Sequence, residues 1–153
     1  MPGTMVGSQA KGFILMNKRN LILIQIAFLL GCQPAVEQSG IPNVAVNVEV
    51  NLSDIDNAAL LQIGGYIYLQ GGVRGIILFH ESQNLYRAFD RNCTYQPSDL
   101  AAVVEVNVSG FFMEDLSCKS NFDLSGFPTD GPAEFPLKEY NVSVAGDFLL
   151  ISN

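Results

Sequence analysis

Short apolar runs separated by glycine-containing turns make up most of the sequence after residue 43. Residues 44–52 alternate apolar and polar side chains, which is the period of a strand with one buried face. The apolar stretches at 65–70 and 75–79 flank the sequence GGVR (71–74), which is typical of a tight hairpin turn. Further strands are expected at residues 85–89, 101–108, 110–114, 138–144 and 147–151. This series predicts an all-β domain, folded as an antiparallel sandwich or a small barrel.

One segment does not follow the strand pattern. Residues 54–62 fit either a single helical turn capped by Ser53 or a loop, and no long helix is expected after residue 43. A chain of 153 residues with 48 % hydrophobic residues is long enough for one domain, not two.

Two of the three cysteines lie in short turns that precede a loop rich in glycine and proline. The first turn reads FDRNCTY (89–95) and contains Cys93, and the second reads CKSNFD (118–123) and begins with Cys118. The loop that follows contains GFP (126–128), GPA (131–133) and PL (136–137), and it leads into YNVSV (140–144).

With these motifs in this order, residues 71–152 resemble the Rieske iron–sulfur domain, most specifically at the GPA segment. In that family one loop carries C-x-H, the second carries C-x-x-H, and a G…GPA…L…Y-x-V segment packs beside them. Two cysteines bind one iron of a [2Fe–2S] cluster and two histidines bind the other. Cys93 and Cys118 match the cysteines, whereas Tyr95 and Asn121 stand at the histidine positions. The resemblance therefore implies a Rieske-like β fold with two cysteine-bearing loops and a degenerate set of cluster ligands.

This resemblance supports two interpretations of the cysteine pair. Two sulfurs that share one iron must lie close together, so in an oxidising compartment we expect a Cys93–Cys118 disulfide in place of the cofactor. The alternative is a [2Fe–2S] cluster held by Cys93, Cys118 and atypical ligands. His80, the only histidine, lies outside both motifs. The carboxylates near the two turns are Asp90, Asp99 and Asp115.

Catalysis is not expected. A redox-active dithiol is a third interpretation of the same pair, but reactive pairs are usually close in sequence, and these cysteines are 25 positions apart. A single histidine with no paired motif around it does not support a nucleophile–base arrangement, so we predict that the chain is not an enzyme.

The N-terminal sequence predicts a lipoprotein signal peptide. Residues 17–19 (NKR) form a positive region, residues 21–30 are apolar, and LLGC (29–32) resembles the lipobox of bacterial lipoproteins, here of a Bacteroidetes type. Cys32 is then the lipidated residue, and two or more acyl chains give stable anchoring. The predicted organisation is a leader and signal peptide at 1–31, a lipidated tether at 32–42 and the Rieske-like β domain at 43–153. Met16 is an alternative start to Met1.

Charge and anchoring together restrict the partners. After Cys32 the chain has 5 basic and 15 acidic residues, a net charge of −10, which disfavours nucleic acid. The expected partners are the lipid bilayer, through acylated Cys32, and a protein of the bacterial cell envelope. The predicted function is a non-catalytic binding or structural module on the extracytoplasmic side. The alternative is a Rieske-type electron-transfer protein that serves an oxidoreductase.

Overall fold

The computed structural model describes residues 40–153. The predicted signal peptide, Cys32 and all but the last three residues of the predicted tether lie outside these residues. The described elements are, in order, β1 (Asn47–Asn51), η2, a 3-10 helix (Ile55–Leu61), β2 (Tyr66–Leu69), β3 (Ile76–Ser82), β4 (Leu85–Asp90), β5 (Val104–Val106), β6 (Met113–Asp115), β7 (Ser120–Phe122), β8 (Pro128–Asp130), β9 (Glu139–Ala145) and β10 (Phe148–Ser152). In the described part of the chain, no helix has the length and apolar character needed to cross a membrane.

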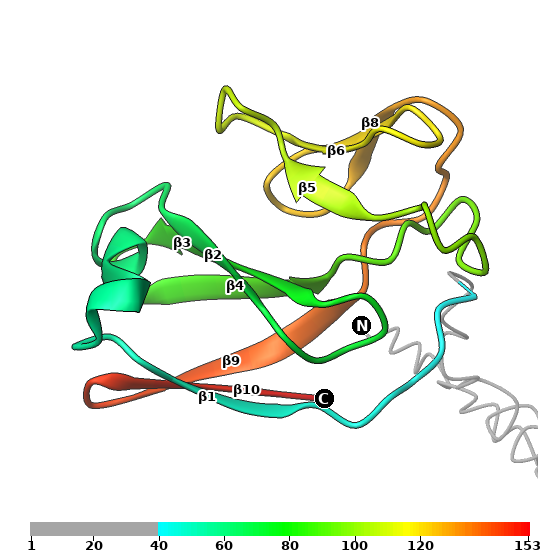
Figure 1. Cartoon of the computed structure of the whole chain (residues 1–153). Coiled ribbons are helices and arrows are strands. Elements are labelled where there is room, and N and C mark those ends of the chain that lie inside the picture. The colour runs from blue at the N-terminus through cyan, green and yellow to red at the C-terminus, as the bar shows by residue number, and fades with distance from the viewer. Residues whose placement is uncertain (1–39) are drawn as a thin grey trace, which may run out of the picture. The chain divides into compact units, whose positions relative to one another are not determined.

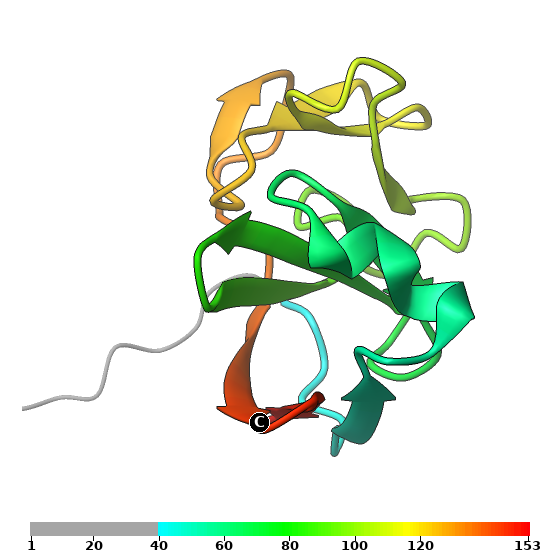
Figure 2. The ribbon, with the colours of Figure 1, turned by 90° about the vertical axis from the view of Figure 1, so that its left-hand side faces the viewer.

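The strands form two antiparallel sheets. The larger sheet has the order β1-β10-β9-β4-β3-β2 and curls into an incomplete barrel (Figure 1). The smaller sheet has the order β5-β6-β7-β8 and lies over β2, β3 and β4, on the side away from β1 and β10 (Figure 2). The all-β prediction is confirmed, and the fold combines the sandwich and the barrel that the sequence left open.

Strand β3 belongs to two cores, and this explains its continuous apolar run. Successive side chains of a strand point to opposite faces. Ile77 contributes to a core under the smaller sheet, together with Phe89, Cys93, Val104, Met113 and Phe122. Ile76 and Leu78 instead pack inside the curled sheet with Val50, Ala88, Tyr140, Leu149 and Ile151. The first core forms the floor of the two cysteine loops.

The predicted hairpins are confirmed, although β3 is longer than expected and β5 and β6 are shorter. β2 pairs with β3 across the glycine turn, β5 with β6, and β9 with β10. Within the segment 54–62, Ile55–Leu61 form the 3-10 helix η2. Its N-cap is Asp54, whose side chain accepts from the Asp56 amide, so the cap at Ser53 considered from the sequence is wrong. Strands β7 and β8 were not predicted, because three-residue strands in a polar, glycine-rich loop carry no period that a sequence pattern can detect.

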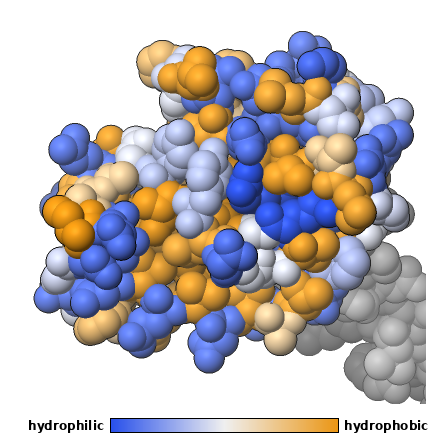
Figure 3. Space-filling view, viewed as in Figure 1, coloured by the Kyte–Doolittle hydropathy of each residue, from blue (hydrophilic) through white to orange (hydrophobic). Residues whose placement is uncertain are grey.

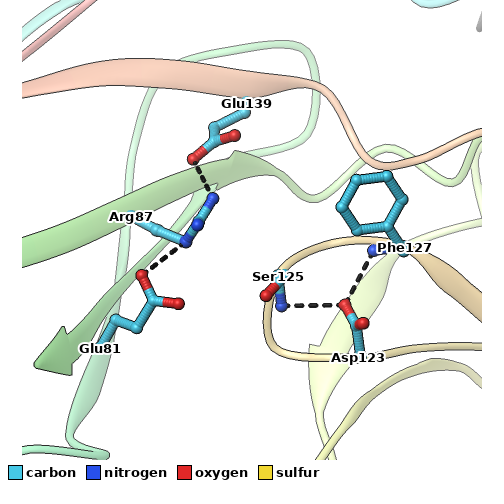
Figure 4. Close-up of polar contacts among 6 residues, drawn as sticks. All are labelled: Glu81, Arg87, Asp123, Ser125, Phe127 and Glu139. Atoms are coloured by element: carbon cyan, nitrogen blue, oxygen red, sulfur yellow. Dashed lines mark hydrogen bonds and ion pairs between the residues drawn. The ribbon is translucent and has the colours of Figure 1, made fainter.

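Strands β4 and β9 join the two halves of the curled sheet through only two residue pairs, Ala88↔Tyr140 and Phe89↔Glu139. Beyond these pairs Arg87 binds Glu81 at 2.7 Å and Glu139 at 2.9 Å (Figure 4). A groove of about 420 Å³ opens there between the two strands. Figure 3 shows hydrophobic residues at the surface on one face of the molecule. Leu85, Val144 and Phe148 are among the exposed apolar side chains of the described residues.

Candidate functional site

A buried carboxylate fixes the start of the first cysteine loop. Asp90 ends β4, has no exposed surface, and accepts hydrogen bonds from the amides of Val73 (2.6 Å) and Asn92 (2.8 Å). It also accepts from the hydroxyl of Tyr140 (2.6 Å). Burial, and then the hydrogen bond to Asp90, raises the pKa of the Tyr140 hydroxyl well above its usual value. Asp90 thus forms a hub that ties the β2–β3 turn, β9 and the first loop together, three residues before Cys93.

The close approach of the β2–β3 turn to Asp90 depends on a glycine. Gly72 has φ +62°, and a Cβ at this position would lie 2.5 Å from Asp90 Oδ2 and 2.8 Å from the Tyr140 hydroxyl. Beside this turn, Arg74 Nε donates to Asn92 Oδ1 at 2.6 Å, which fixes the residue that precedes Cys93.

A second buried carboxylate forms the turn that carries Cys118. Asp115 ends β6 and is 1 % exposed; its Oδ1 accepts from the amides of Ser117 (2.8 Å) and Cys118 (3.4 Å). Its backbone carbonyl accepts from the amide of Lys119, which has φ +64° and turns the chain into β7. This tight β6–β7 connection places the Cys118 side chain toward the first loop.

The two cysteine sulfurs lie in contact. Cys93 Sγ is 3.4 Å from Cys118 Sγ, and Cys118 Sγ is 3.2 Å from Asp115 Oδ2 and 3.1 Å from Ser120 Oγ. Cys93 is fully buried, whereas Cys118 is partly exposed. Burial, assisted by hydrogen bonds to Asp115 and Cys118, raises the pKa of the Cys93 thiol to about 12. Cys93 is therefore a protonated thiol at neutral pH and a poor nucleophile.

The GPA segment packs against both loops, as the resemblance implied. The amide of Ala133 donates to Ser120 Oγ at 3.1 Å, and Thr94 Oγ1 donates to the carbonyl of Phe135 at 2.7 Å. A Cβ on Gly131 would overlap the backbone of Lys119 and Ser120, so only glycine allows this approach. A shallow cavity of about 270 Å³ is lined by Thr94, Tyr95, Pro132, Glu134 and Phe135.

The residues at the two histidine positions do not join the sulfurs in one donor set. The Tyr95 side chain is 46 % exposed and lines the shallow cavity. Asn121 lies in the middle of β7 between the buried Ser120 and Phe122, so its side chain points to the opposite face from the Ser120 hydroxyl that contacts Cys118. His80 lies on β3, where its ring stacks on Tyr86 with centroids 4.3 Å apart.

The three carboxylates considered from the sequence have different roles. Asp115 completes a group with Cys93 and Cys118 in which all donor atoms lie within 4.8 Å of one another, the one such group of three potential metal ligands among residues 40–153. Asp90 is occupied in the hub with Tyr140, and Asp99 caps a turn through the Ala101 amide. Sequence reasoning missed Ser120, which no motif marks, although its hydroxyl lies against Cys118.

This donor set does not fit a Rieske cluster. A [2Fe–2S] centre of that kind needs two thiolates on one iron and two imidazoles on the other. The site offers two thiols and one carboxylate, and the residues at the histidine positions are a half-exposed phenol and an amide on the other face of β7. The second iron therefore has no pair of ligands of the usual kind.

Comparison with known proteins supports the fold. No family model matches the sequence, and no curated protein matches it. Among solved structures, the cyanobacterial plasma membrane Rieske protein PetC3 from Synechocystis PCC 6803 is similar, with a TM-score of 0.51 and 14 % identity over 72 % of this chain and all of that one. The ferredoxin of carbazole 1,9a-dioxygenase from Nocardioides aromaticivorans IC177 gives a TM-score of 0.46 and 18 % identity, over 71 % of this chain and 97 % of that one. The similarity to the first of these structures supports a Rieske-like β fold for this chain.

Proposed function

We propose that the chain is a non-catalytic binding or structural module on a Rieske-like scaffold, in which a Cys93–Cys118 disulfide replaces the cluster as the link between the two loops. The observation that carries this proposal is the sulfur–sulfur distance of 3.4 Å. A disulfide bond is about 2.05 Å long, so the sulfurs must approach by roughly 1.4 Å, which small side-chain rotations supply. The chemistry is a two-electron oxidation: two thiol protons and two electrons pass to an external disulfide, which leaves as two thiols.

The disulfide has a clear structural benefit for a domain of this size. It closes a loop of 25 residues, which corresponds to about 3.5 kcal/mol in the chain-entropy model. The loop contains β5 and β6 and ends at the turn into β7, so the bond joins the smaller sheet to the end of β4. Without metal ligands at positions 95 and 121, this bond takes over the role of holding the loops together.

Anchoring through acylated Cys32 is the second part of the proposal. It places the domain on the extracytoplasmic side of a bacterial membrane, where disulfides persist, and it rests on the LLGC sequence at 29–32. Metabolic labelling with an alkyne-bearing fatty acid tests it. Label is expected in the full chain and not in Cys32→Ser; equal labelling of the two, or none in either, contradicts the anchor.

A thiol count tests the disulfide. The full-length protein is isolated without reductant, treated with a metal chelator, unfolded and reacted with a thiol reagent. We expect no reactive thiol at Cys93 or Cys118, two after reduction, and one at Cys118 in the Cys93→Ser variant. Two reactive thiols in the unreduced wild-type protein would refute the bond.

The alternative function is electron transfer through a [2Fe–2S] cluster that uses Cys93 and Cys118 as two of its ligands. The presence of Asp115 beside both sulfurs is the observation in its favour. Iron content and visible absorption of protein isolated without oxygen distinguish the two functions. A colourless protein without stoichiometric iron supports the disulfide module, and two irons per chain with charge-transfer bands support the electron carrier.

A further inference from the structure

The same three donors that fail to fit a two-iron cluster are arranged as the ligands of one metal ion. Cys93, Asp115 and Cys118 come from three different segments: the loop after β4, the end of β6 and the β6–β7 turn. Two of the three are essentially unexposed, with Cys93 at 0 % and Asp115 at 1 %. We infer that the reduced protein binds a single thiophilic divalent cation, of which Zn²⁺ is the best fit, through Cys93 Sγ, Cys118 Sγ and Asp115 Oδ2.

The distances between the donor atoms support one small tetrahedral ion. With bonds of about 2.3 Å to sulfur and about 2.1 Å to oxygen, ligand atoms of a tetrahedral zinc site lie roughly 3.5–3.8 Å apart. The observed separations are 3.4 Å between the sulfurs and 3.2 Å from Cys118 Sγ to Asp115 Oδ2, and every pair is within 4.8 Å. The donor atoms therefore need to shift by only about 1 Å or less to bind the ion.

The hydrogen bonds around Asp115 leave one of its oxygens free for a metal ion. Oδ1 already accepts from the amides of Ser117 and Cys118, which fixes the orientation of the carboxylate. Oδ2 lies against the thiols of the site, with Cys118 Sγ donating to it at 3.2 Å, and no backbone amide of the described residues donates to it. This division, with one oxygen held by the backbone and the other directed at the ligand position, is the outer-shell support that metal sites require.

The balance of buried charge also favours a divalent cation. Two thiols and one carboxylate carry a net charge of −1. If a dication takes the place of the two thiol protons, the net charge of the site stays at −1, so no new unpaired charge is buried. Thiolate ligands select zinc over magnesium or calcium. Three protein ligands leave a fourth position for water, on the side where Cys118 is partly exposed.

This inference concerns the reduced pair and does not depend on the disulfide proposed above. Oxidation removes both thiolates, so the metal and the disulfide exclude each other at this site. The thiol count of unreduced protein tests the disulfide, whereas metal titration of reduced protein tests the metal site, and either can fail without the other.

Cobalt is the probe, because Co²⁺ bound to thiolates has an intense charge-transfer absorption. The full-length protein, without a histidine tag, is reduced, freed of reductant without oxygen and titrated with Co²⁺. We expect one equivalent to bind with this absorption, Zn²⁺ to displace it, and the oxidised protein to show none. Absence of the absorption in folded, reduced wild-type protein would overturn the inference.

Variants test the ligand set. Asp115→Asn should weaken Co²⁺ binding by at least about tenfold, the loss typical even of an outer-shell partner, and Cys118→Ser should abolish the charge-transfer band. The control is Asp123→Asn, which changes a carboxylate of the next turn that accepts from the Ser125 and Phe127 amides (Figure 4) and should leave affinity unchanged. Near-ultraviolet circular dichroism checks folding. If Asp115→Asn does not fold, Cys93→Ser replaces it as the second ligand variant. An unchanged affinity in a folded ligand variant contradicts the site.

Discussion

Removal of one hydroxyl group at Tyr140 tests the hub that positions the first cysteine loop. In Tyr140→Phe the ring keeps its packing, while the Asp90 carboxylate loses a donor at 2.6 Å and keeps the Val73 and Asn92 amides. A hydrogen bond to a buried charged group contributes about 1.5–3 kcal/mol. We therefore expect a loss of about 2 kcal/mol in the free energy of unfolding, measured by urea denaturation at pH 7. For a domain of this length that corresponds to a decrease in Tm of roughly 8 °C.

Tyr86→Phe is the matched control. It removes the same atom from a tyrosine whose hydroxyl makes only a 3.5 Å contact with the Leu60 carbonyl, so the expected loss is below about 0.5 kcal/mol. The two variants should also differ in alkali. The pKa of Tyr140 is raised from its ordinary value of 10.0 in the folded state, so the stability that the neutral phenol contributes is complete below pH 10 and declines above it. Equal stability of the two variants, or an alkaline decline that Tyr140→Phe leaves unchanged, would refute the role of the hub.

Three further predictions follow from the same contacts. Gly72→Ala should destabilise the fold by about 3 kcal/mol or more in urea denaturation, because its Cβ would meet Asp90. The control Gly146→Ala has a similar φ of +63° but open space around it, so it should cost only about 1 kcal/mol. Equal losses in the two variants would contradict this. In the reduced protein, the free energy of unfolding should decline by at most about 1.4 kcal/mol per pH unit as pH rises from 9.0 toward 12, because the Cys93 thiol stays protonated in the folded state and ionises in the unfolded state. The oxidised protein should lack this decline, and identical pH profiles of the two forms would count against the prediction. Arg87→Met should lower the free energy of unfolding by less than about 1 kcal/mol at low salt and by less still at 1 M NaCl, since the ion pairs with Glu81 and Glu139 are partly exposed. A large, salt-independent loss in the same assay would contradict this.

The fold was largely predictable because its strands are marked by local patterns. The period-two run before Leu52 marks a strand, and Gly71 and Gly146 each mark a hairpin turn. The structure has all three features. Strands β7 and β8 could not be predicted, since they exist only through pairing with each other and with β6. The cap of η2 was assigned one residue too early, because Ser53 and Asp54 are equally good caps in isolation.

The candidate site was predictable only in part. The spacing of the motifs identified Cys93 and Cys118, and the structure brings their sulfurs into contact. Asp115 was one of three equivalent carboxylates in the sequence, and only the β6–β7 turn distinguishes it from Asp90 and Asp99. The contact of Gly72 with Asp90 joins residues 18 positions apart through the pairing of β3 with β4, and no local pattern encodes that distance.

One tryptic peptide reports directly whether a covalent bond between Cys93 and Cys118 holds the two loops together. Trypsin cleaves after Arg91 and Lys119, and no lysine or arginine lies between, so both cysteines fall in the peptide 92–119, separate from Cys32. The full-length protein is isolated without reductant, alkylated while unfolded, and digested. If the bond is present, this peptide carries no alkyl group and is two hydrogen masses lighter than the dithiol form. A peptide with an alkyl group on each cysteine would contradict it.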